Sequence, residues 1–476
     1  MLLVDIYVNE LWPYVLPLPK RPFDQYKVLL SAFSSELSLE ILKQASSGRP
    51  VFQSELLHKL PYSSKTILGC LNKLVSSGVL ESGMDKKRSK GRLVWVKWYK
   101  PTALGRWFGL LLLPPKKVSV ADASRLLSQI FGQYSRNVAK LSSRLSFSAS
   151  SLLSEYHGAY VSEVVSEHKA AARDLDIVVF GSVAMDQVVP VEDFALGETT
   201  PVGSLYQYPG GSGATVAVGL SRLGLVTGFA GRIGCDFWGQ RLVEEILKEN
   251  VDLSQLVPSE QLETLRTIIM VDKEGRKRMI VPTTNVAISL DSPSQIEWRR
   301  IEKASAIYLG ETFVELAELI AGHAKSQGKP VFYRLLSPFA KFGMEKLLGI
   351  LKSVKVTYMN EQGWNRLSEV SPRLSDPANL LEAGPDIVSV TKNRQGCSVY
   401  TKQKKIEVKA PVVKSIDSTG AGDAFAAAFT KLTLDGRPVE EAARYACAAA
   451  ALSTTKRGAW ASMPRREEIS RFMGAM

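Results

Sequence analysis

Apolar residues follow one pattern in the first third of this chain and another in the remainder. In the first third they recur every three or four positions, which is the spacing of amphipathic helices. Three segments show this spacing: Ser38–Ala45, Gln53–Leu60 and Ser63–Val75. The third starts with a serine, which favours the N-cap position, and keeps Ile67, Leu71 and Leu74 on one face. The pattern predicts three short helices separated by turns.

From residue 176 the pattern changes to short, fully apolar runs that alternate with helical segments. The runs are Ile177–Phe180, Val226–Ala230, Ala306–Leu309, Pro330–Tyr333, Lys355–Tyr358 and Ile387–Thr391. Such alternation indicates an α/β fold, a doubly wound and mostly parallel sheet with helices on both faces. Around Thr267–Asn285 apolar and polar residues alternate, first along one predicted strand and then along a second strand that runs back. This pattern predicts a small β lid.

A basic stretch follows the three predicted helices. Asp85–Arg92 is polar and cationic, and Leu93–Tyr99 alternates as a strand does. Helices separated by turns and followed by a cationic hairpin resemble the winged helix-turn-helix family, over about residues 25–110. The resemblance implies binding to double-stranded DNA, with the third helix in the major groove and the hairpin on phosphates. The residues implied for DNA binding are Lys65, Thr66, Lys86, Lys87, Arg88, Lys90 and Arg92.

Charge is distributed unevenly between the two regions. Residues 1–173 hold 24 Lys and Arg against 12 Asp and Glu, whereas the remaining residues hold 36 against 35. Such asymmetry is typical of a polyanion-binding module joined to a near-neutral one. The alternative is a helical domain that binds a protein partner, with a basic hairpin that is merely solvated.

Between these regions the sequence is helical and rich in serine. We assign residues 1–115 to the winged helix-turn-helix domain, 116–173 to a helical connector and 174–476 to the α/β domain. Winged-helix proteins commonly read two-fold sites as dimers, so we expect a homodimer. No apolar run approaches the length of about 20 residues that crosses a bilayer, and the four cysteines have no metal-binding or disulfide spacing. A cytoplasmic protein without membrane contact is therefore expected.

The segment Ser415–Asp423 carries the clearest chemistry. It places an aspartate directly after a Gly-Ala-Gly turn and before a run of small residues. The amides of Gly420, Ala421 and Gly422 would lie at a helix N-terminus, where they and the helix dipole favour an anion. Asp423 would then take a proton from a substrate hydroxyl, which predicts a kinase. The alternative is an ordinary helix start in which Asp423 complements the dipole.

Five separated motifs resemble the ribokinase-like, or PfkB, family of carbohydrate and nucleoside kinases. They are Gly181–Asp186, Gly197–Thr200 followed by Pro209–Ala217, Gly231–Gly239, Asp417–Asp423 and Lys456–Pro464. The first of them resembles the end of the family's first strand, so we expect Asp186 to end the first strand of the main sheet. The resemblance covers residues 176–476 and implies a ribokinase-like fold and phosphoryl transfer from ATP, with Mg²⁺. It implies that Asp186, Gly210, Gly211 and Thr215 bind the sugar or nucleoside, and that Asn360, Thr391 and Gly396 bind the nucleotide. It further implies a monovalent cation such as K⁺ on Asp417, Thr419 and Ser462.

Three positions depart from the family pattern. Thr215 stands where the family usually has asparagine, and Gly363 stands where it has a glutamate linked to magnesium. Asn393 replaces a common glycine, which asparagine tolerates because it adopts left-handed backbone. The leading hypothesis is an ATP-dependent sugar or nucleoside kinase fused to a DNA-binding domain. The alternative is a transcription regulator that senses a sugar or nucleotide through a weakened kinase domain.

Overall fold

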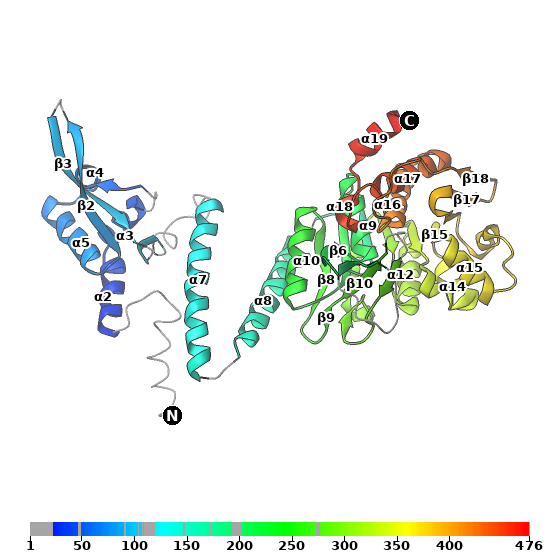
Figure 1. The fold of residues 1–476 in the computed structure, drawn as a ribbon, viewed down its shortest axis with the longest axis horizontal. Helices are drawn as coiled ribbons and strands as arrows, with labels where there is room; N and C mark the ends of the chain where they lie inside the picture. The colour runs from blue at the N-terminus through cyan, green and yellow to red at the C-terminus, as the bar shows by residue number, and fades with distance from the viewer. Residues whose placement is uncertain are drawn as a thin grey trace. The chain divides into compact units, whose positions relative to one another are not determined.

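The computed structural model describes most of the chain as two compact units. The described residues are 22–45, 49–89, 92–102, 104–106, 108, 120–145, 148–171, 173–192, 202–272 and 277–475. The first unit runs from Met1 to Ser151 and the second from Leu152 to Met476 (Figure 1).

The first unit contains helices and a three-stranded antiparallel sheet. In chain order its elements are α2 (Pro22–Phe33), α3 (Glu36–Ala45), β1 (Val51–Phe52), α4 (Gln53–Lys59), α5 (Ser64–Ser76), β2 (Leu80–Ser89), β3 (Arg92–Pro101) and α7 (Val120–Leu145). The three helices predicted from residue 38 onward are confirmed as α3, α4 and α5. Ser63 is the N-cap of α5, because its Oγ accepts a hydrogen bond from the Thr66 N–H at 3.2 Å. Ile67, Leu71 and Leu74 are buried.

The cationic stretch after α5 is mostly strand. The prediction placed residues 85–92 in a polar tip, but β2 and β3 pair in register from Leu80↔Pro101 to Ser89↔Arg92. Alternation in a strand directs Lys86 and Lys87 to opposite faces of the hairpin. Lys86 lies over the ring of Trp95 and Lys87 over the ring of Phe52. Contact with these aromatic rings stabilises a basic ribbon longer than the sequence pattern indicated.

The second unit is built on a mostly parallel sheet, as predicted. Over the described residues the strand order is β18-β17-β16-β15-β14-β13-β4-β7-β8, with only the β17 and β18 pairings antiparallel. The strands are β4 (Ile177–Phe180), β7 (Thr227–Gly234), β8 (Asp252–Ser259), β13 (Ala306–Leu309), β14 (Val331–Arg334), β15 (Val356–Asn360), β16 (Ile387–Thr391), β17 (Cys397–Thr401) and β18 (Lys405–Val408). The chain builds outward in both directions from β4 and β13. The carboxyl ends of these two strands therefore form the topological switch point, where ligands bind in such sheets.

Helices cover both faces of this sheet. Alternate residues of β4 face opposite layers: Ile177 and Val179 belong to one core cluster, and Val178 and Phe180 to the other. The first layer includes α8 (Ala149–Ala170), α9 (Ser212–Arg222), α10 (Phe237–Lys248), α16 (Ala421–Leu434), α17 (Val439–Ser453), α18 (Ala459–Ser462) and α19 (Arg466–Gly474). The second includes α11 (Trp298–Lys303), α12 (Val314–Ser326), α13 (Ser337–Ala340), α14 (Gly343–Leu351) and α15 (Glu361–Val370).

Helix α8, predicted as part of a connector, packs on the second unit from residue 152 onward. Val161 and Val165 are buried in the first core layer. His157 Nδ1 lies 2.6 Å from Gln240 Oε1 on α10, and the His157 ring contacts Phe237. The predicted connector is thus divided, with α7 in the first unit and most of α8 in the second.

A second, smaller sheet confirms the predicted lid. Its order is β11-β10-β5-β6, formed by β5 (Ala184–Pro190), β6 (Tyr206–Gly210), β10 (Arg266–Val271) and β11 (Lys277–Ile280). A separate two-stranded sheet pairs β9 (Glu263–Thr264) with β12 (Val286–Ala287). In the chain, β9 comes just before β10 and β12 follows β11. The expectation that Asp186 ends the first strand of the main sheet is wrong. β4 ends at Phe180, and Asp186 belongs to β5 of the lid sheet, paired with Tyr208 and Thr267.

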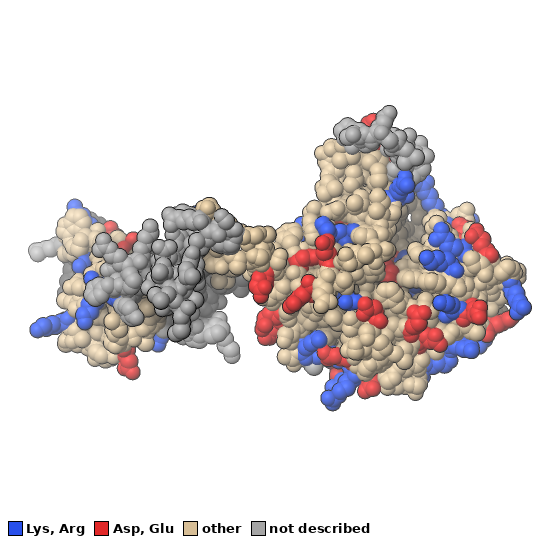
Figure 2. All heavy atoms as spheres, turned by 90° about the horizontal axis from the view of Figure 1, so that it is seen from below, with Lys and Arg blue, Asp and Glu red and all other residues tan. Residues whose placement is uncertain are grey.

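Three expectations from composition can be compared with the described residues. No helix among them is both long and apolar enough to cross a membrane. All four cysteines are free. On the face drawn in Figure 2, basic and acidic side chains are interspersed over the second unit, in line with its near-neutral charge.

Candidate functional site

The Gly-Ala-Gly turn forms the start of α16. Gly420 is the N-cap residue with a φ of 82°, a left-handed conformation that favours glycine. The first i→i−4 bond of α16 runs from Ala424 N to Gly420 O at 2.8 Å, so the N–H groups of Ala421, Gly422 and Asp423 precede the helical ladder. Of these, Ala421 N makes a long bond of 3.3 Å to Ser418 O. Asp423 lies in this first turn and is only 7% exposed. The predicted base and anion cradle are therefore adjacent at one helix end.

Two side chains that the sequence patterns did not single out hold Asp423. Ser212 Oγ donates to Asp423 Oδ1 at 2.5 Å. Arg334 Nη1 donates to the same oxygen and also contacts Ser212 Oγ at 3.0 Å. Arg334 ends β14, and a Cβ added to Gly422 would lie 2.7 Å from its Nη2. A guanidinium thus lies against the glycine turn and pairs with the predicted base.

Asp186 is as buried as Asp423 but has a neutral partner. Its Oδ1 accepts a 2.5 Å hydrogen bond from Thr267 Oγ1. Burial raises the pKa of Asp186 to about 6, and the nearby charges of Asp417 and Glu311 act in the same direction. The Thr267 hydrogen bond and the positive charge of Lys277 limit this rise.

The loop at the start of α9 connects the two aspartates. A Cβ on Gly210 would lie 2.1 Å from Asp186 Oδ2, so only glycine fits beside this carboxylate. Ser212, two residues later, holds Asp423. Two residues of chain span at most about 7 Å, so this loop brings both acids to one place. Gly211 has a φ of 83° and packs against the backbone of Ser182 and Val183, which follow β4.

Glu311 lies at the topological switch point. It follows β13, and its Oε2 accepts hydrogen bonds from Gly213 N at 3.0 Å and Ser182 N at 3.4 Å. It therefore fixes the α9 loop against the end of β4. Thr215 is fully buried and its hydroxyl donates to Gly211 O at 2.7 Å. The Thr215 hydroxyl bonds to its own helix at this predicted substrate-binding position.

The predicted nucleotide-binding residues lie at the ends of β15 and β16. Asn360 is the N-cap of α15, with Oδ1 accepting from Gly363 N at 2.8 Å and from Ser337 Oγ at 3.1 Å. Thr391 is its register neighbour on β16. Asn393 has a φ of 51°, which confirms that it adopts the left-handed backbone expected of a glycine substitute. Gly396 is required by packing, because a Cβ there would lie 1.9 Å from Val408 O.

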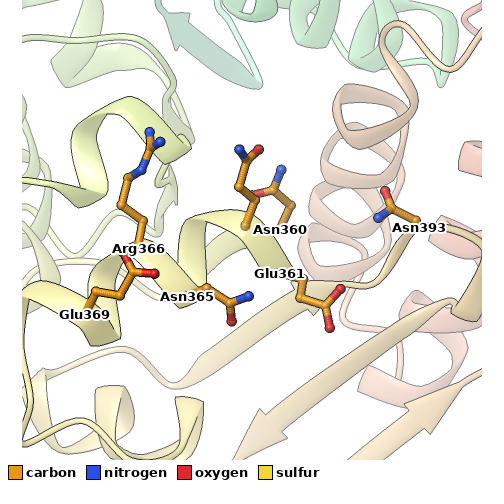
Figure 3. A pocket seen from close by; sticks show the side chains of 7 residues that line it. Asn360, Glu361, Asn365, Arg366, Glu369 and Asn393 are labelled. Carbon is orange, nitrogen blue, oxygen red and sulfur yellow. The ribbon is translucent and has the colours of Figure 1, made fainter. Parts of the chain in front are cut away.

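A polar cavity of about 460 Å³ opens beside Asn360. Its lining consists of Asn360, Glu361, Gln362, Asn365, Arg366, Glu369 and Asn393 (Figure 3). Most of these side chains project from the first turns of α15, and Asn393 faces them from the turn after β16. Glu361 supplies a carboxylate to this cavity, two residues before the glycine that replaces the family's glutamate.

Two of the three predicted cation ligands, Asp417 and Thr419, contact a lysine. Lys277 Nζ on β11 donates to Asp417 Oδ1 at 2.8 Å and to Thr419 Oγ1 at 2.5 Å. Burial raises the pKa of Asp417, but hydrogen bonds from Lys277 and from the N–H groups of Thr419 and Gly458 outweigh it and lower the pKa below its ordinary value. Ser462 is buried on α18, and its hydroxyl donates to Ala459 O at 3.0 Å.

Comparison with known proteins shows the family of the second unit. The family model described as pfkB family carbohydrate kinase matches residues 174–466. This chain belongs to that family. The ribokinase of Haemophilus influenzae is 30% identical over 307 residues, which are 62% of this chain and 98% of the relative. Fructokinase-1 of Oryza sativa subsp. japonica is 26% identical over 323 residues, 64% of this chain and 99% of the relative.

A solved structure gives the same result at the level of the fold. The ribokinase of Arabidopsis thaliana, complexed with ribose and ATP, aligns with a TM-score of 0.55 and 25% identity. The alignment covers 63% of this chain and 99% of that ribokinase. The fold of the second unit is therefore ribokinase-like, and residues 1–173 lie outside the matched family model.

In this pfkB-family chain the predicted DNA-contacting residues belong to the first unit. Lys65 is exposed in the first turn of α5, and Thr66 follows it, with its Oγ1 2.7 Å from Ser63 Oγ. Lys86 and Lys87 are exposed on β2. Lys90 and the side chains of Arg88 and Arg92 lie outside the described residues.

Proposed function

We propose that this chain transfers the γ-phosphoryl group of ATP to a hydroxyl group of a sugar or nucleoside. The observation that carries the proposal is the α9 loop, which contacts Asp186 through Gly210 and Asp423 through Ser212. A carboxylate suited to binding hydroxyls thus stands beside a carboxylate suited to deprotonating one. Both lie at the carboxyl ends of the parallel strands, where ligands bind in this class of sheet.

Asp423 is the proposed general base. Both Ser212 and Arg334 bond to Oδ1, so we assign Oδ2 as the oxygen that takes the proton of the acceptor hydroxyl. The acceptor oxygen forms a bond to the γ-phosphorus as the bond between that phosphorus and the bridging oxygen breaks, and ADP leaves. The N–H groups at the start of α16 and the guanidinium of Arg334 stabilise the negative charge on the transferring group.

Asp186 is the proposed acceptor-binding residue. With a pKa of about 6 it is mainly ionised at neutral pH and accepts hydrogen bonds from substrate hydroxyls. Gly210 lets the backbone approach the same carboxylate. Glu311 acts one step away, because it fixes the loop that positions Gly210 and Ser212.

The donor set beside the polar cavity fits a magnesium ion bound with the nucleotide. Mg²⁺ is usually held by one or two carboxylates together with phosphate oxygens and water. Asn360 Oδ1 is occupied by two donors, so the carboxylates of the lining, Glu361 and Glu369, are the side chains that would hold the ion. When bound, Mg²⁺ neutralises charge on the phosphates. Arg334 contributes a fixed positive charge against Gly422 of the glycine turn.

The test is phosphorylation of a panel of pentoses, hexoses, inositols and nucleosides with ATP. We expect one acceptor class to be phosphorylated, and Asp423→Asn to lower kcat by about 10²–10⁴-fold because the base is lost. Asp435→Asn is the matched control, since Asp435 caps the other end of α16 and pairs with Lys431. Full activity of Asp423→Asn, or no phosphorylated acceptor, would contradict the proposal.

We further propose that the first unit is a winged helix that binds double-stranded DNA. The supporting observation is the long antiparallel β2–β3 ribbon after α5, with the exposed Lys86 and Lys87 on β2 and half-buried lysines on β3. Cationic side chains on such a ribbon neutralise phosphates, and the excess of basic residues in 1–173 provides the long-range attraction. A homodimer would present two such ribbons to a two-fold DNA site.

Fluorescence anisotropy with labelled duplex DNA tests this second proposal. We expect affinity to fall steeply with salt, and the double variant Lys86→Ala/Lys87→Ala to bind at least about tenfold more weakly. Lys27→Ala is the control, because Lys27 is exposed on α2. In Figure 1 this helix lies at the opposite end of the first unit from the far end of the β2–β3 ribbon. Absence of binding at low salt would favour a protein-binding module instead. A sugar that changes DNA affinity would support the sensor hypothesis.

A further inference from the structure

Lys277 joins the lid to the loop that leads into the catalytic turn. It is the first residue of β11, where it pairs with Val271 of β10. Its ammonium bonds to Asp417 and Thr419, three and one residues before Gly420. The neighbouring strand β10 carries Thr267, which bonds to Asp186. The lid hairpin therefore contacts the acceptor-binding acid through one strand and the catalytic loop through the other.

Asp417 accepts hydrogen bonds from donors in three segments. Its oxygens accept from Thr419 N at 2.9 Å, from Gly458 N at 3.1 Å and from Lys277 Nζ at 2.8 Å. Gly458 has a φ of 83° and packs closely on Tyr208 of the lid sheet. The carboxylate thus joins the catalytic loop, the C-terminal loop and the lid.

These contacts do not fit an additional monovalent cation at the same oxygens. A bound K⁺ would need the Asp417 and Thr419 oxygens that the Lys277 ammonium already contacts. Two positive charges on the same pair of oxygens would lie close together and repel each other. The hydroxyl of the third predicted ligand, Ser462, donates a hydrogen bond to Ala459 O. An ammonium offers three hydrogen-bond donors to oxygen, so it satisfies the same carboxylate and hydroxyl oxygens that such a cation takes.

We propose that Lys277 supplies the positive charge at the Asp417–Thr419 loop in place of a monovalent cation and thereby tethers the lid to the catalytic turn. Phosphoryl transfer by this chain then needs no added K⁺. This inference rests on the proposed kinase function only for its activity readout. The tether itself is a property of the ligand-free protein.

The test compares the wild type, Lys277→Met, Lys277→Arg and Arg278→Met in chloride salts of K⁺, Na⁺ and tetramethylammonium. Each salt is used at about 150 mM, so that general screening is constant. Arg278 is the neighbouring exposed cation of β11 and controls for loss of charge from the lid. The readouts are the melting temperature, hydrogen exchange of the lid amides in 266–281, and kcat/KM for the acceptor.

We expect the wild type, Lys277→Arg and Arg278→Met to behave alike in all three salts. Lys277→Met should lose kcat/KM by about tenfold or more in tetramethylammonium, show faster lid exchange, and recover both in K⁺. A wild type whose activity or melting temperature rises specifically with K⁺ would overturn the proposal. So would a Lys277→Met protein whose lid exchange equals that of Arg278→Met. If the wild type phosphorylates no acceptor, the kinase function fails, while melting and exchange still decide the role of Lys277.

Discussion

The two aspartates of the candidate site are equally buried but have different partners. Asp186 and Asp423 are each 7% exposed. Asp423 is paired with the guanidinium of Arg334, whereas Asp186 bonds to the neutral hydroxyl of Thr267. Because the two carboxylates are equally buried, their partners distinguish them. A charged partner stabilises an ionised carboxylate, whereas a neutral partner leaves the desolvation cost of the ionised form largely uncompensated. The position with the cation is the proposed base, and the other is the proposed acceptor-binding site.

Removal of the Arg334 guanidinium should have the largest effect on the difference between the two aspartates. Arg334→Met leaves Asp423 buried without a charged partner, so we expect loss of about 3 kcal/mol of stability and at least about 10²-fold in kcat/KM. Thermal melting and steady-state kinetics measure the two effects. Arg299→Met, an exposed arginine on α11, is the control. In an Asp423→Asn background the stability loss should shrink, and an undiminished loss there would show that Arg334 acts independently of Asp423.

Titration of Asp186 should give the next largest effect. Its pKa is about 6 in the folded protein against an ordinary value of 3.8. Between these values the folded protein holds a proton that the unfolded chain has lost, so this group stabilises the fold at low pH. That contribution falls as pH rises through 6, by about 3 kcal/mol in total. The difference in unfolding free energy between the wild type and Asp186→Asn, measured from about pH 4 to 7.5, reports it. A difference that does not change with pH would contradict the assignment.

The same titration should affect acceptor binding in the opposite sense. Only the ionised carboxylate accepts hydrogen bonds from hydroxyl groups at both oxygens, so acceptor affinity should weaken below about pH 6. Titration calorimetry of the acceptor at several pH values on both sides of this pKa measures the change in affinity. An acceptor affinity that stays constant from about pH 5 to about pH 7.5 would show that Asp186 does not bind the acceptor.

Close packing around Asp186 predicts a smaller effect. Gly210→Ala places a Cβ against Asp186 Oδ2, so we expect the acceptor KM to rise about tenfold while kcat changes little. Gly203→Ala is the control, because a Cβ at Gly203 would meet no atom within 4 Å. If both variants bind the acceptor like the wild type, the backbone near Gly210 does not contact substrate.

The two hydroxyl partners should give the smallest effects, and these should differ in kind. Thr267→Val and Ser212→Ala each remove one hydrogen bond worth about 1 kcal/mol. Thr267→Val should move the acid limb of the acceptor-binding profile to higher pH, because that bond lowers the Asp186 pKa. Ser212→Ala should leave the limb in place and reduce kcat a few-fold. Identical profiles for the two variants would erase the proposed distinction.

Features that depend on a few adjacent residues were predictable from the sequence. The N-cap at Ser63, the glycine turn before Asp423 and the left-handed backbone at Asn393 all follow from local backbone geometry. The parallel sheet was also predictable, because strands buried on both faces must be continuously apolar. The placement of Asp186 was mistaken, since the apolar run and the aspartate belong to two strands of different sheets.

The sequence by itself determined the glycine turn, the place of the proposed base directly after it, and the alternation of strands and helices, because each depends on neighbours within a turn or a strand. Only the tertiary structure decided which charges meet. Arg334 reaches Asp423 across 89 residues, and Lys277 reaches Asp417 across 140. Those contacts depend on the order of strands in the sheet and on the position of the lid. A lysine in a lid hairpin and an arginine at a strand end are ordinary surface residues until the fold brings a carboxylate to each.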